Sequence, residues 1–536
     1  MSRSIYYLVL LLLLAGCAGA IPEPPTPTPQ PLTEEATVTV ATATTVQEAV
    51  PQETPEPSLP ADPILAACRP EIQQIPFQDG LEPDLAALGL DACYELNFSL
   101  SATGESYAAT AQVTLRNDTE DSWPNLLFRL YPESQRVFRG DIEVDRVTLS
   151  GTDVEWERTL EDETGLLLPL STSLEPGDTV VVEIAFTGEP ADITLNQEGQ
   201  YGIFALGENT VTLASWFPLL AVWNEEENDW HDVPVQGEGD AVFSESALIE
   251  AALAAPDRFQ LAVSGTILEQ QSEDGLTTYE VVTGPARDLT MVWMDGYEVE
   301  EEMVDGTLLR NWYLPGHEAG ADRALSAAVE SLPIFNTHFG PYPFEELDII
   351  EVPLAGAGGV EYPQLYLLDQ GLYEEPDSHA FLAFASAHEM AHQWWYYLVG
   401  NDIIEAPWQD EALTNWSAIF WLEQAEGEEV AERYLLGYER SVAEFEEQEG
   451  EEPIAQPLTA FRDRGGAYGI IVYLKGTLFF QALREEIGDE PFFEALQAYY
   501  AENRFDIARP EELLAQFEET SGRSLDEFYR EWGLTQ

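Results

Sequence analysis

The sequence predicts an α+β protein of more than one domain, in which an N-terminal antiparallel β-sandwich-like domain precedes a mostly helical domain. With 536 residues, the chain is longer than a usual single domain. From about residue 93 to 297, short strand-like stretches alternate with Asp, Gly, Asn and Pro breaks, as in antiparallel sheets. After Gly306 the hydrophobic pattern becomes helical. We therefore place the two domains at residues 67–300 and 301–536.

Individual elements follow from the same patterns. In the first domain, clear strands are expected at residues 109–115, 126–130, 179–186 and 260–264. The aromatic-rich segment 216–230 either lines a cleft or belongs to the core, which is the commoner place for aromatics in a β domain. In the second domain we expect strands at 308–313 and 347–352 and helices at 321–335, 378–398, 411–425, 428–445, 469–486, 490–500 and 510–520.

The N-terminus is predicted to lie outside the fold. Arg3 precedes the apolar run 5–14, which is too short to span a membrane comfortably but suits an export signal. The run ends in Leu-Ala-Gly-Cys17, which resembles the lipobox of bacterial lipoproteins, and this resemblance implies lipidation of Cys17. The alternative is an ordinary secretory signal in which Cys17 is incidental. We expect a signal peptide at 1–17 and an extracytoplasmic protein anchored by lipid to a bacterial membrane at the cell surface.

Residues 18–66 are rich in Pro, Thr, Glu and Ala and lack hydrophobic periodicity, which predicts a disordered tether. The two remaining cysteines, Cys68 and Cys93, either form one disulfide in an oxidising compartment or stay as two unpaired buried thiols.

Charge is the most unusual property of the composition. The chain has 99 acidic and 22 basic residues, and its formal net charge is −77. Because phosphates are repelled by such a surface, we expect no nucleic-acid partner. Lysine occurs only at Lys475, so every other basic side chain is arginine. That single ammonium group is therefore expected to have a specific local role.

A metal-binding pattern lies in the predicted helix 378–398. His388 and His392 are four residues apart, so both imidazoles can lie on one face of a helix and bind one ion. Glu389, beside the first of them, is placed to act as a general base on water. A catalytic zinc needs three protein ligands and one open position. The third ligand is expected to be Glu411, with Glu405, Asp410 and Glu423 as rivals.

The surrounding residues resemble the aminopeptidase N family of zinc metallopeptidases, which are gluzincins with a thermolysin-like catalytic domain. HEMAHQWW matches the HExxH helix of that family followed by Trp, and WQDE matches the W-x-x-E context of its third ligand, which eighteen residues separate from the second histidine. Gly358-Gly359-Val360-Glu361-Tyr362 is similar to the G-x-M-E-N exopeptidase motif, and YLKG at 473–476 is similar to Y-x-K-G. The resemblance covers residues 93 to the C-terminus.

The resemblance implies a role for each matched residue. Zn²⁺, one per chain, is held by His388, His392 and Glu411, and Glu389 is the general base. Tyr473 is expected to donate a hydrogen bond to the oxyanion. The alternative is a buried helix tyrosine with a backbone partner. Glu361 is expected to bind the free α-amine of the substrate, or else to be an exposed loop residue. Further substrate-binding positions are Gly358, Gly359 and Tyr468.

Three departures from the family pattern bear on the reaction. Tyr362 stands where the family has Asn, Val360 replaces Met, and Ala412 follows the third ligand where Gly is common. The chain is also expected to lack the large C-terminal helical domain of many relatives, because it ends about sixty residues after Tyr473.

The preferred prediction is a zinc aminopeptidase that acts on peptides. The alternatives are an endopeptidase or oligopeptidase of the same zinc class with an uncapped cleft, and a catalytically inactive surface protein that binds peptides. The strand 347–352 is expected to offer backbone hydrogen bonds to an extended peptide. His231, His317, His338 and His379 lack partner spacing and are read as structural or surface residues. The sequence makes no prediction of the oligomeric state.

Overall fold

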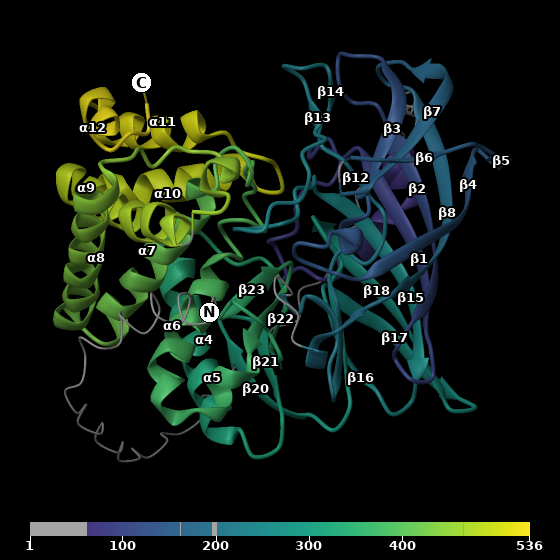
Figure 1. Ribbon diagram of the computed structural model, residues 1–536, viewed down its shortest axis with the longest axis horizontal. Helices are drawn as coiled ribbons and strands as arrows, with labels where there is room; N and C mark the ends of the chain where they lie inside the picture. Colours follow the sequence, from purple (N-terminus) through teal and green to yellow (C-terminus); the bar gives the residue numbers. More distant parts are fainter. Residues whose placement is uncertain (1–61, 161, 196–200, 465, 536) are drawn as a thin grey trace, which may run out of the picture.

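The computed structural model describes residues 62–160, 162–195, 201–464 and 466–535 (Figure 1). The predicted signal peptide with Cys17 and most of the predicted tether lie outside these residues. The predicted tether, 18–66, is wrong at its C-terminal end, because helix α2 spans Pro63–Ala67. Asp62 caps this helix by accepting the backbone N–H of Ile64 at 2.9 Å, and Ile64 is buried.

A disulfide fixes this N-terminal segment to the first sheet. Cys68 and Cys93 are joined with a Cα–Cα distance of 5.8 Å, and Cys93 lies in strand β1 (Ala92–Leu100). Of the two sequence-based alternatives, the structure has the paired one. A second short helix, α3 (Pro70–Gln73), follows directly.

The first region of the molecule consists of β-sheets, on the right in Figure 1. Its largest sheet has eight strands in the order β17-β18-β15-β1-β2-β8-β4-β5, and smaller sheets have the orders β16-β19-β11-β10-β9, β12-β3-β7-β6 and β13-β14. Pairing is antiparallel except for β1 with β15 and β9 with β10. The strands are β2 (Tyr107–Arg116), β3 (Trp123–Arg129), β4 (Asp141–Leu149), β5 (Thr152–Asp153), β6 (Glu157–Thr159), β7 (Gly165–Leu174), β8 (Thr179–Glu189), β9 (Ala191–Asp192), β10 (Phe204–Leu206), β11 (Thr210–Leu213), β12 (Leu219–Leu220), β13 (Trp223–Asn224), β14 (Asp229–Trp230), β15 (Ala247–Pro256), β16 (Gln260–Val263), β17 (Thr266–Glu273), β18 (Leu276–Ala286) and β19 (Met291–Met294).

The aromatic-rich segment belongs to the core of this region. Trp216 and Phe217 are fully buried and pack edge-on, with ring centroids 5.1 Å apart. The Trp216 indole N–H donates to the carbonyl of Leu289 at 2.8 Å, which satisfies its polar atom inside the core. Of the two sequence-based readings of residues 216–230, the core reading is therefore the right one for these side chains.

The second region of the molecule begins with a mixed sheet. This sheet starts at Glu298 and has the strand order β20-β21-β22-β24-β23. Its strands are β20 (Glu298–Val304), β21 (Thr307–Tyr313), β22 (Glu346–Val352), β23 (Gly359–Tyr362) and β24 (Leu365–Asp369). Strand β22 is paired on both sides, to β21 and to β24. Its predicted role as the strand that receives a peptide is therefore wrong, because its backbone groups are already used. The edge strands of this sheet are β20 and β23.

Helices cover this sheet and make up the rest of the chain, on the left in Figure 1. They are α4 (Glu318–His338), α5 (Gln370–Glu374), α6 (His379–Ala391), α7 (Trp408–Ala425), α8 (Glu428–Glu449), the π-helical segment η5 (Gly469–Lys475), α9 (Gly476–Ile487), α10 (Asp489–Asn503), α11 (Pro510–Ser521) and α12 (Asp526–Glu531), with short 3-10 turns at Tyr131–Glu133, Ile193–Leu195, Pro376–Ser378 and Leu458–Phe461. Within the described residues, no helix combines the length and apolar character needed to cross a membrane.

Two predicted helices differ from the observed ones. Helix α6 ends at Ala391 rather than at 398, and the chain then turns through Tyr396, which has φ of 135°. The apolar run continues after Ala391 because Trp394 and Trp395 are buried in the core, not because they are helical. The predicted helix 469–486 begins as the π-helical segment η5, a feature that often occurs at functional sites.

Arg287, from the β region, joins the two regions. Its guanidinium is buried and donates to the carbonyl oxygens of Ser244 at 3.0 Å, Tyr396 at 3.0 Å and Asp506 at 2.5 Å. Tyr396 lies on the loop that follows α6, so the β region supports the backbone next to the predicted metal ligands.

Candidate active site

Helix α6 and its C-cap residue place His388 and His392 on the same buried face. His388 and His392 have 8% and 1% of their surfaces exposed, and Glu389 has 5%. The Nε2 atoms of the two imidazoles are 3.2 Å apart. Because both rings lie against the core of the second region, their position is set by packing as well as by the four-residue spacing.

Glu411 reaches the same point from the first turn of α7. Its Oε2 atom lies 3.3 Å from Nε2 of His388 and 3.4 Å from Nε2 of His392. Tetrahedral ligands at about 2.0–2.1 Å from an ion lie about 3.3–3.4 Å from one another. The three atoms therefore fit a zinc ion, with a fourth position left for water. Glu361, Glu389 and His392 form an overlapping cluster, but it shares His392 and belongs to the same site.

Hydrogen bonds on the far side of His392 orient its ring. Its Nδ1 lies 2.9 Å from the carbonyl oxygen of Trp395, which only a protonated Nδ1 can satisfy. The hydroxyl of Thr414, on α7, is 3.3 Å from the same atom. A proton on Nδ1 leaves the Nε2 lone pair free for a metal ion. The turn that ends α6 early thus has a direct effect on the site.

The three rival carboxylates do not reach this point. Glu405 is exposed, and Glu423 forms hydrogen bonds of 2.7 and 3.0 Å with Arg484. Asp410 is buried, but one of its oxygens accepts the backbone N–H of Glu411 at 2.7 Å. Only Glu411 of the four lies within reach of both imidazoles.

Tyr473 lies beside the ligands and comes from η5. Its hydroxyl donates to Oε1 of Glu411, and its ring stacks on the imidazole of His388 with centroids 5.9 Å apart. Close approach of η5 to α7 depends on two small residues, since a Cβ on Gly476 would lie 2.3 Å from Cβ of Ala412. The glycine of the Y-x-K-G pattern is therefore required by packing next to the third ligand.

The lone lysine anchors the same segment. The ammonium group of Lys475 donates to Oε1 of Glu446 at 2.8 Å and to the carbonyl of Glu452 at 2.7 Å, and its side chain is 9% exposed. Glu446 is in α8 and Glu452 is in the loop after it. Lys475 thereby ties η5, with Tyr473, to its neighbouring helix and loop.

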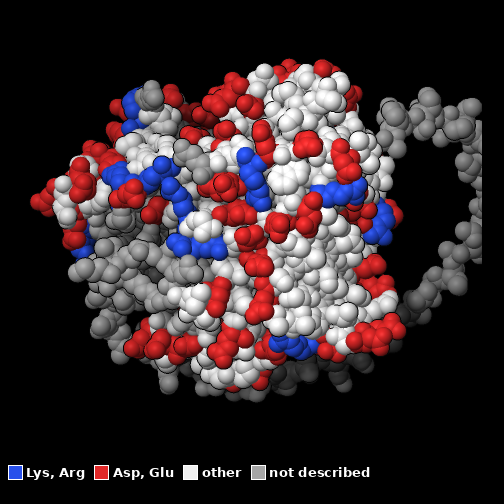
Figure 2. Space-filling model, turned by 45° about the vertical axis from the view of Figure 1, so that its right-hand side comes forward, with Lys and Arg blue, Asp and Glu red and all other residues white. Residues whose placement is uncertain are grey.

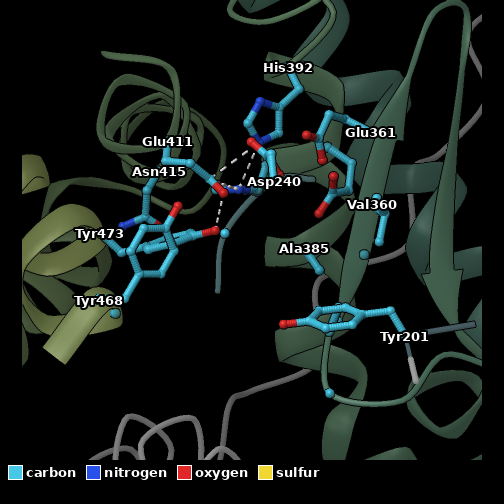
Figure 3. Close-up of a pocket in the computed structure, with 18 of the residues that line it drawn as sticks. Tyr201, Asp240, Val360, Glu361, Ala385, His392, Glu411, Asn415, Tyr468 and Tyr473 are labelled. Atoms are coloured by element: carbon cyan, nitrogen blue, oxygen red, sulfur yellow. Dashed lines mark hydrogen bonds and ion pairs between the residues drawn. The ribbon is translucent and has the colours of Figure 1, made fainter. Parts of the chain in front are cut away.

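The three candidate ligands, Glu389 and Tyr473 line one cavity of about 290 Å³ between the two regions (Figure 3). Edge strand β23 contributes Gly359, Val360 and Glu361 to its wall. A Cβ on Gly359 would lie 2.4 Å from a carboxylate oxygen of Glu389, so glycine is needed for that close approach. A Cβ on Gly358 would likewise lie 2.9 Å from a ring carbon of Phe381. Tyr468 also lines the cavity, and its hydroxyl is buried without a partner among the described residues.

Asp240 is the site residue that the sequence analysis missed. It lies between β14 and β15, on the cavity wall, and its carboxyl group is hydrogen-bonded to that of Glu361. Figure 3 shows both side chains near His392. The segment Gln236–Asp240 matches no motif, and its Gly-rich composition reads as an ordinary loop. The one feature of the sequence that could have indicated Asp240 as a cavity residue is its position soon after the aromatic-rich segment 216–230.

The electrostatics of the cavity follow from this crowding of carboxyl groups. Burial raises the pKa of Glu361 and of Glu389 to about 8 in each case, because it disfavours the charged form, and neighbouring carboxylates add to the rise. Burial also acts to raise the pKa of Glu411, but hydrogen bonds with the two imidazoles outweigh it and lower the pKa to about 2. A divalent cation among these groups would lower the pKa of each carboxyl group, since opposite charge favours ionisation.

The other four histidines lie outside the cavity. His317 contacts the buried carboxylate of Glu351 at 2.7 Å, and His231 lies 3.8 Å from Asp402. His338 and His379 each contact a backbone carbonyl. Each therefore has a structural partner.

Comparison with known proteins agrees with this geometry. The model of the Peptidase family M1 domain matches residues 323–532, which include all three candidate metal ligands, Glu361 and Tyr473. Aminopeptidase M1-B of Oryza sativa subsp. japonica is 27% identical over 241 residues, and Aminopeptidase N of Streptomyces lividans is 26% identical over 199 residues.

These similarities differ in how much of each chain they cover. The match covers 44% of this chain and 28% of the rice protein, and 36% of this chain and 23% of the Streptomyces protein, so the chain spans about a quarter of these relatives. The M1 zinc metallopeptidase of Deinococcus radiodurans has a similar fold over 83% of this chain and 95% of its own, with a TM-score of 0.60 and 19% identity. The arrangement of a β-rich region followed by an M1 domain is therefore that of a known structure, as the sequence predicted.

Proposed function

We propose that this protein is a zinc-dependent peptidase that removes N-terminal residues from peptides. The observation that carries the proposal is the set of Nε2 of His388, Nε2 of His392 and Oε2 of Glu411 at 3.2–3.4 Å from one another, in a cavity that also contains Glu389. Names of the relatives support the reaction class, since several are aminopeptidases.

The catalytic roles follow from positions around this triad. When bound, zinc supplies the Lewis acidity that polarises the scissile carbonyl and activates water. Glu389 takes the proton from the attacking water and passes it to the leaving amine. The hydroxyl of Tyr473 donates a hydrogen bond to Glu411 in the free protein. In the reaction, the same hydroxyl donates to the oxyanion instead, as negative charge develops there.

Selection of the free N-terminus is assigned to the carboxyl pair of Glu361 and Asp240. Two carboxyl groups that share a hydrogen bond are a suitable receptor for an ammonium group, which can donate hydrogen bonds to both. The pair joins the two regions, because Glu361 is on edge strand β23 and Asp240 belongs to the β region. β23 also has a free edge that is available to the backbone of an extended peptide.

The test compares free and N-acetylated substrates. The metal-loaded protein should hydrolyse leucine p-nitroanilide, refuse its N-acetyl form, lose activity with a chelator and regain it with zinc. Cleavage of acetylated peptides at internal bonds would contradict the aminopeptidase assignment and show that the protein is an endopeptidase with an open cleft. A protein that binds zinc and peptide but turns over neither substrate would be an inactive binding protein.

We also propose that the chain is exported and held on a bacterial membrane by lipid at Cys17. Support comes from the apolar run 5–14 and the sequence Leu-Ala-Gly-Cys17. Palmitate labelling of the expressed protein tests this, with Cys17→Ser as the comparison. The wild type should be labelled and pellet with membranes, and equal labelling of both proteins would contradict the proposal.

A further inference from the structure

Carboxyl groups from four parts of the chain face the cavity. Two come from the segment between β14 and β15, and the others come from β23, α6 and α7. They belong to Glu238, Asp240, Glu361, Glu389 and Glu411.

Cationic side chains next to the cavity are bound elsewhere. Arg462 donates to Oε1 of Gln236 at 2.7 Å, and Lys475 is held by Glu446. Arg464 is paired with Glu452. Among the described residues that line the cavity, none is Lys or Arg. Figure 2 shows that Asp and Glu also outnumber Lys and Arg on one outer face.

The part of the cavity away from the amine-binding pair has an apolar wall. In Figure 3, Ala385 and Tyr201 lie lower in the cavity than Glu361. Phe381 and Phe384 of α6 line the same cavity. Such a wall favours an uncharged side chain of the second residue and offers no compensation to an anion.

We propose that the protein acts on peptides whose C-terminal carboxylate lies far from the cleaved bond, and that it rejects free dipeptides. This rests on the proposed function. Glu361 and Asp240 fix the α-amine, and the scissile carbonyl lies at the triad. A dipeptide ends one residue later, about 3.8 Å of chain, so its carboxylate remains inside the acidic cavity. In a longer peptide, or one with an amidated C-terminus, no such charge enters.

The experiment compares Leu-Phe with Leu-Phe-amide, which differ only at that group. We expect kcat/KM to be at least about tenfold higher for the amide, because like charges about 7 Å apart at the effective dielectric of a protein surface repel this strongly. The ratio should shrink in 1 M NaCl, where the screening length falls to about 3 Å. Equal kcat/KM values for acid and amide would overturn the inference.

Leucine p-nitroanilide separates this inference from the proposed function. A metal-loaded protein that hydrolyses the nitroanilide and both dipeptides equally fails only the inference. A metal-loaded protein that leaves all three substrates intact fails the proposed function.

A charge-reversal variant tests the cause. Glu238→Arg places a cation on the cavity wall and should raise the ratio of kcat/KM for Leu-Phe to that for Leu-Phe-amide at least fivefold. Glu227→Arg makes the same change at an exposed residue and should leave the ratio unaltered. Should Glu238→Arg fail to fold, Glu238→Gln should give a smaller change in the same direction. An unchanged ratio in a folded Glu238 variant would contradict the electrostatic cause.

Discussion

The two walls of the cavity are built in different ways. On the helical wall, the key groups are on regular elements: His388 and Glu389 on α6, Glu411 on α7 and Tyr473 on η5. On the wall from the β region, Asp240 and Glu238 come from an irregular segment between two strands. Regular elements hold side chains at fixed spacings, which suits a metal ion with narrow distance limits. Loops suit the recognition of a substrate, where sequence can change without loss of the fold.

The largest expected effect is on the helical wall, at the general base. Glu389→Gln keeps the shape of the side chain but cannot accept a proton, so kcat should fall about 10²–10⁴-fold. Zinc content should not change, because the ligand atoms belong to neighbouring residues. Glu405→Gln removes an exposed carboxylate thirteen residues after His392 and serves as the control. Turnover at the wild-type rate in Glu389→Gln would show that this wall does not carry the chemistry.

The next effect concerns the oxyanion donor. Tyr473→Phe removes one hydroxyl and should lower kcat about a hundredfold, with little change in KM, because the lost hydrogen bond forms mainly in the transition state. The matched comparison is Tyr468→Phe, which removes another tyrosine hydroxyl from the cavity wall and should cost much less. If the two variants lose equal activity, Tyr473 acts through packing alone.

The sequence was informative about the helical wall because its motifs are local. His388 and His392 are one helical turn apart, and Glu411 opens the next regular helix. The prediction failed where the chain left regular structure. It extended α6 to 398 because Trp394 and Trp395 are apolar, although they pack outside the helix.

Long-range pairing was beyond the sequence as well. Which strand forms the edge depends on sheet order, and hydrophobicity along the run 347–352 cannot distinguish a central strand from an edge strand. Asp240 lies 121 residues before Glu361 in the chain, and only the packing of the two regions brings their carboxyl groups together.

A smaller effect is expected on the β wall. Asp240→Asn removes one of the two carboxyl groups assigned to the substrate amine and should raise KM for free-amine substrates about tenfold, with a smaller change in kcat. Asp232→Asn makes the same substitution at an exposed residue nearby and should leave KM unchanged. An unchanged KM in Asp240→Asn would show that Asp240 does not bind the amine and would leave Glu361 of the second region as its receptor.

The smallest effect separates charge from shape at Lys475. Its ammonium group has two acceptors, Oε1 of Glu446 and the carbonyl of Glu452, in a site that leaves the side chain 9% exposed. Lys475→Arg keeps the charge but inserts a larger planar group, so η5 should shift and kcat should fall a few-fold with KM nearly constant. Lys475→Met removes the charge as well and should lose more activity. The thermal midpoint of each variant shows whether the loss is local. A chain that uses arginine at its other basic positions would then keep lysine here because only a compact cation holds Tyr473 against the third ligand.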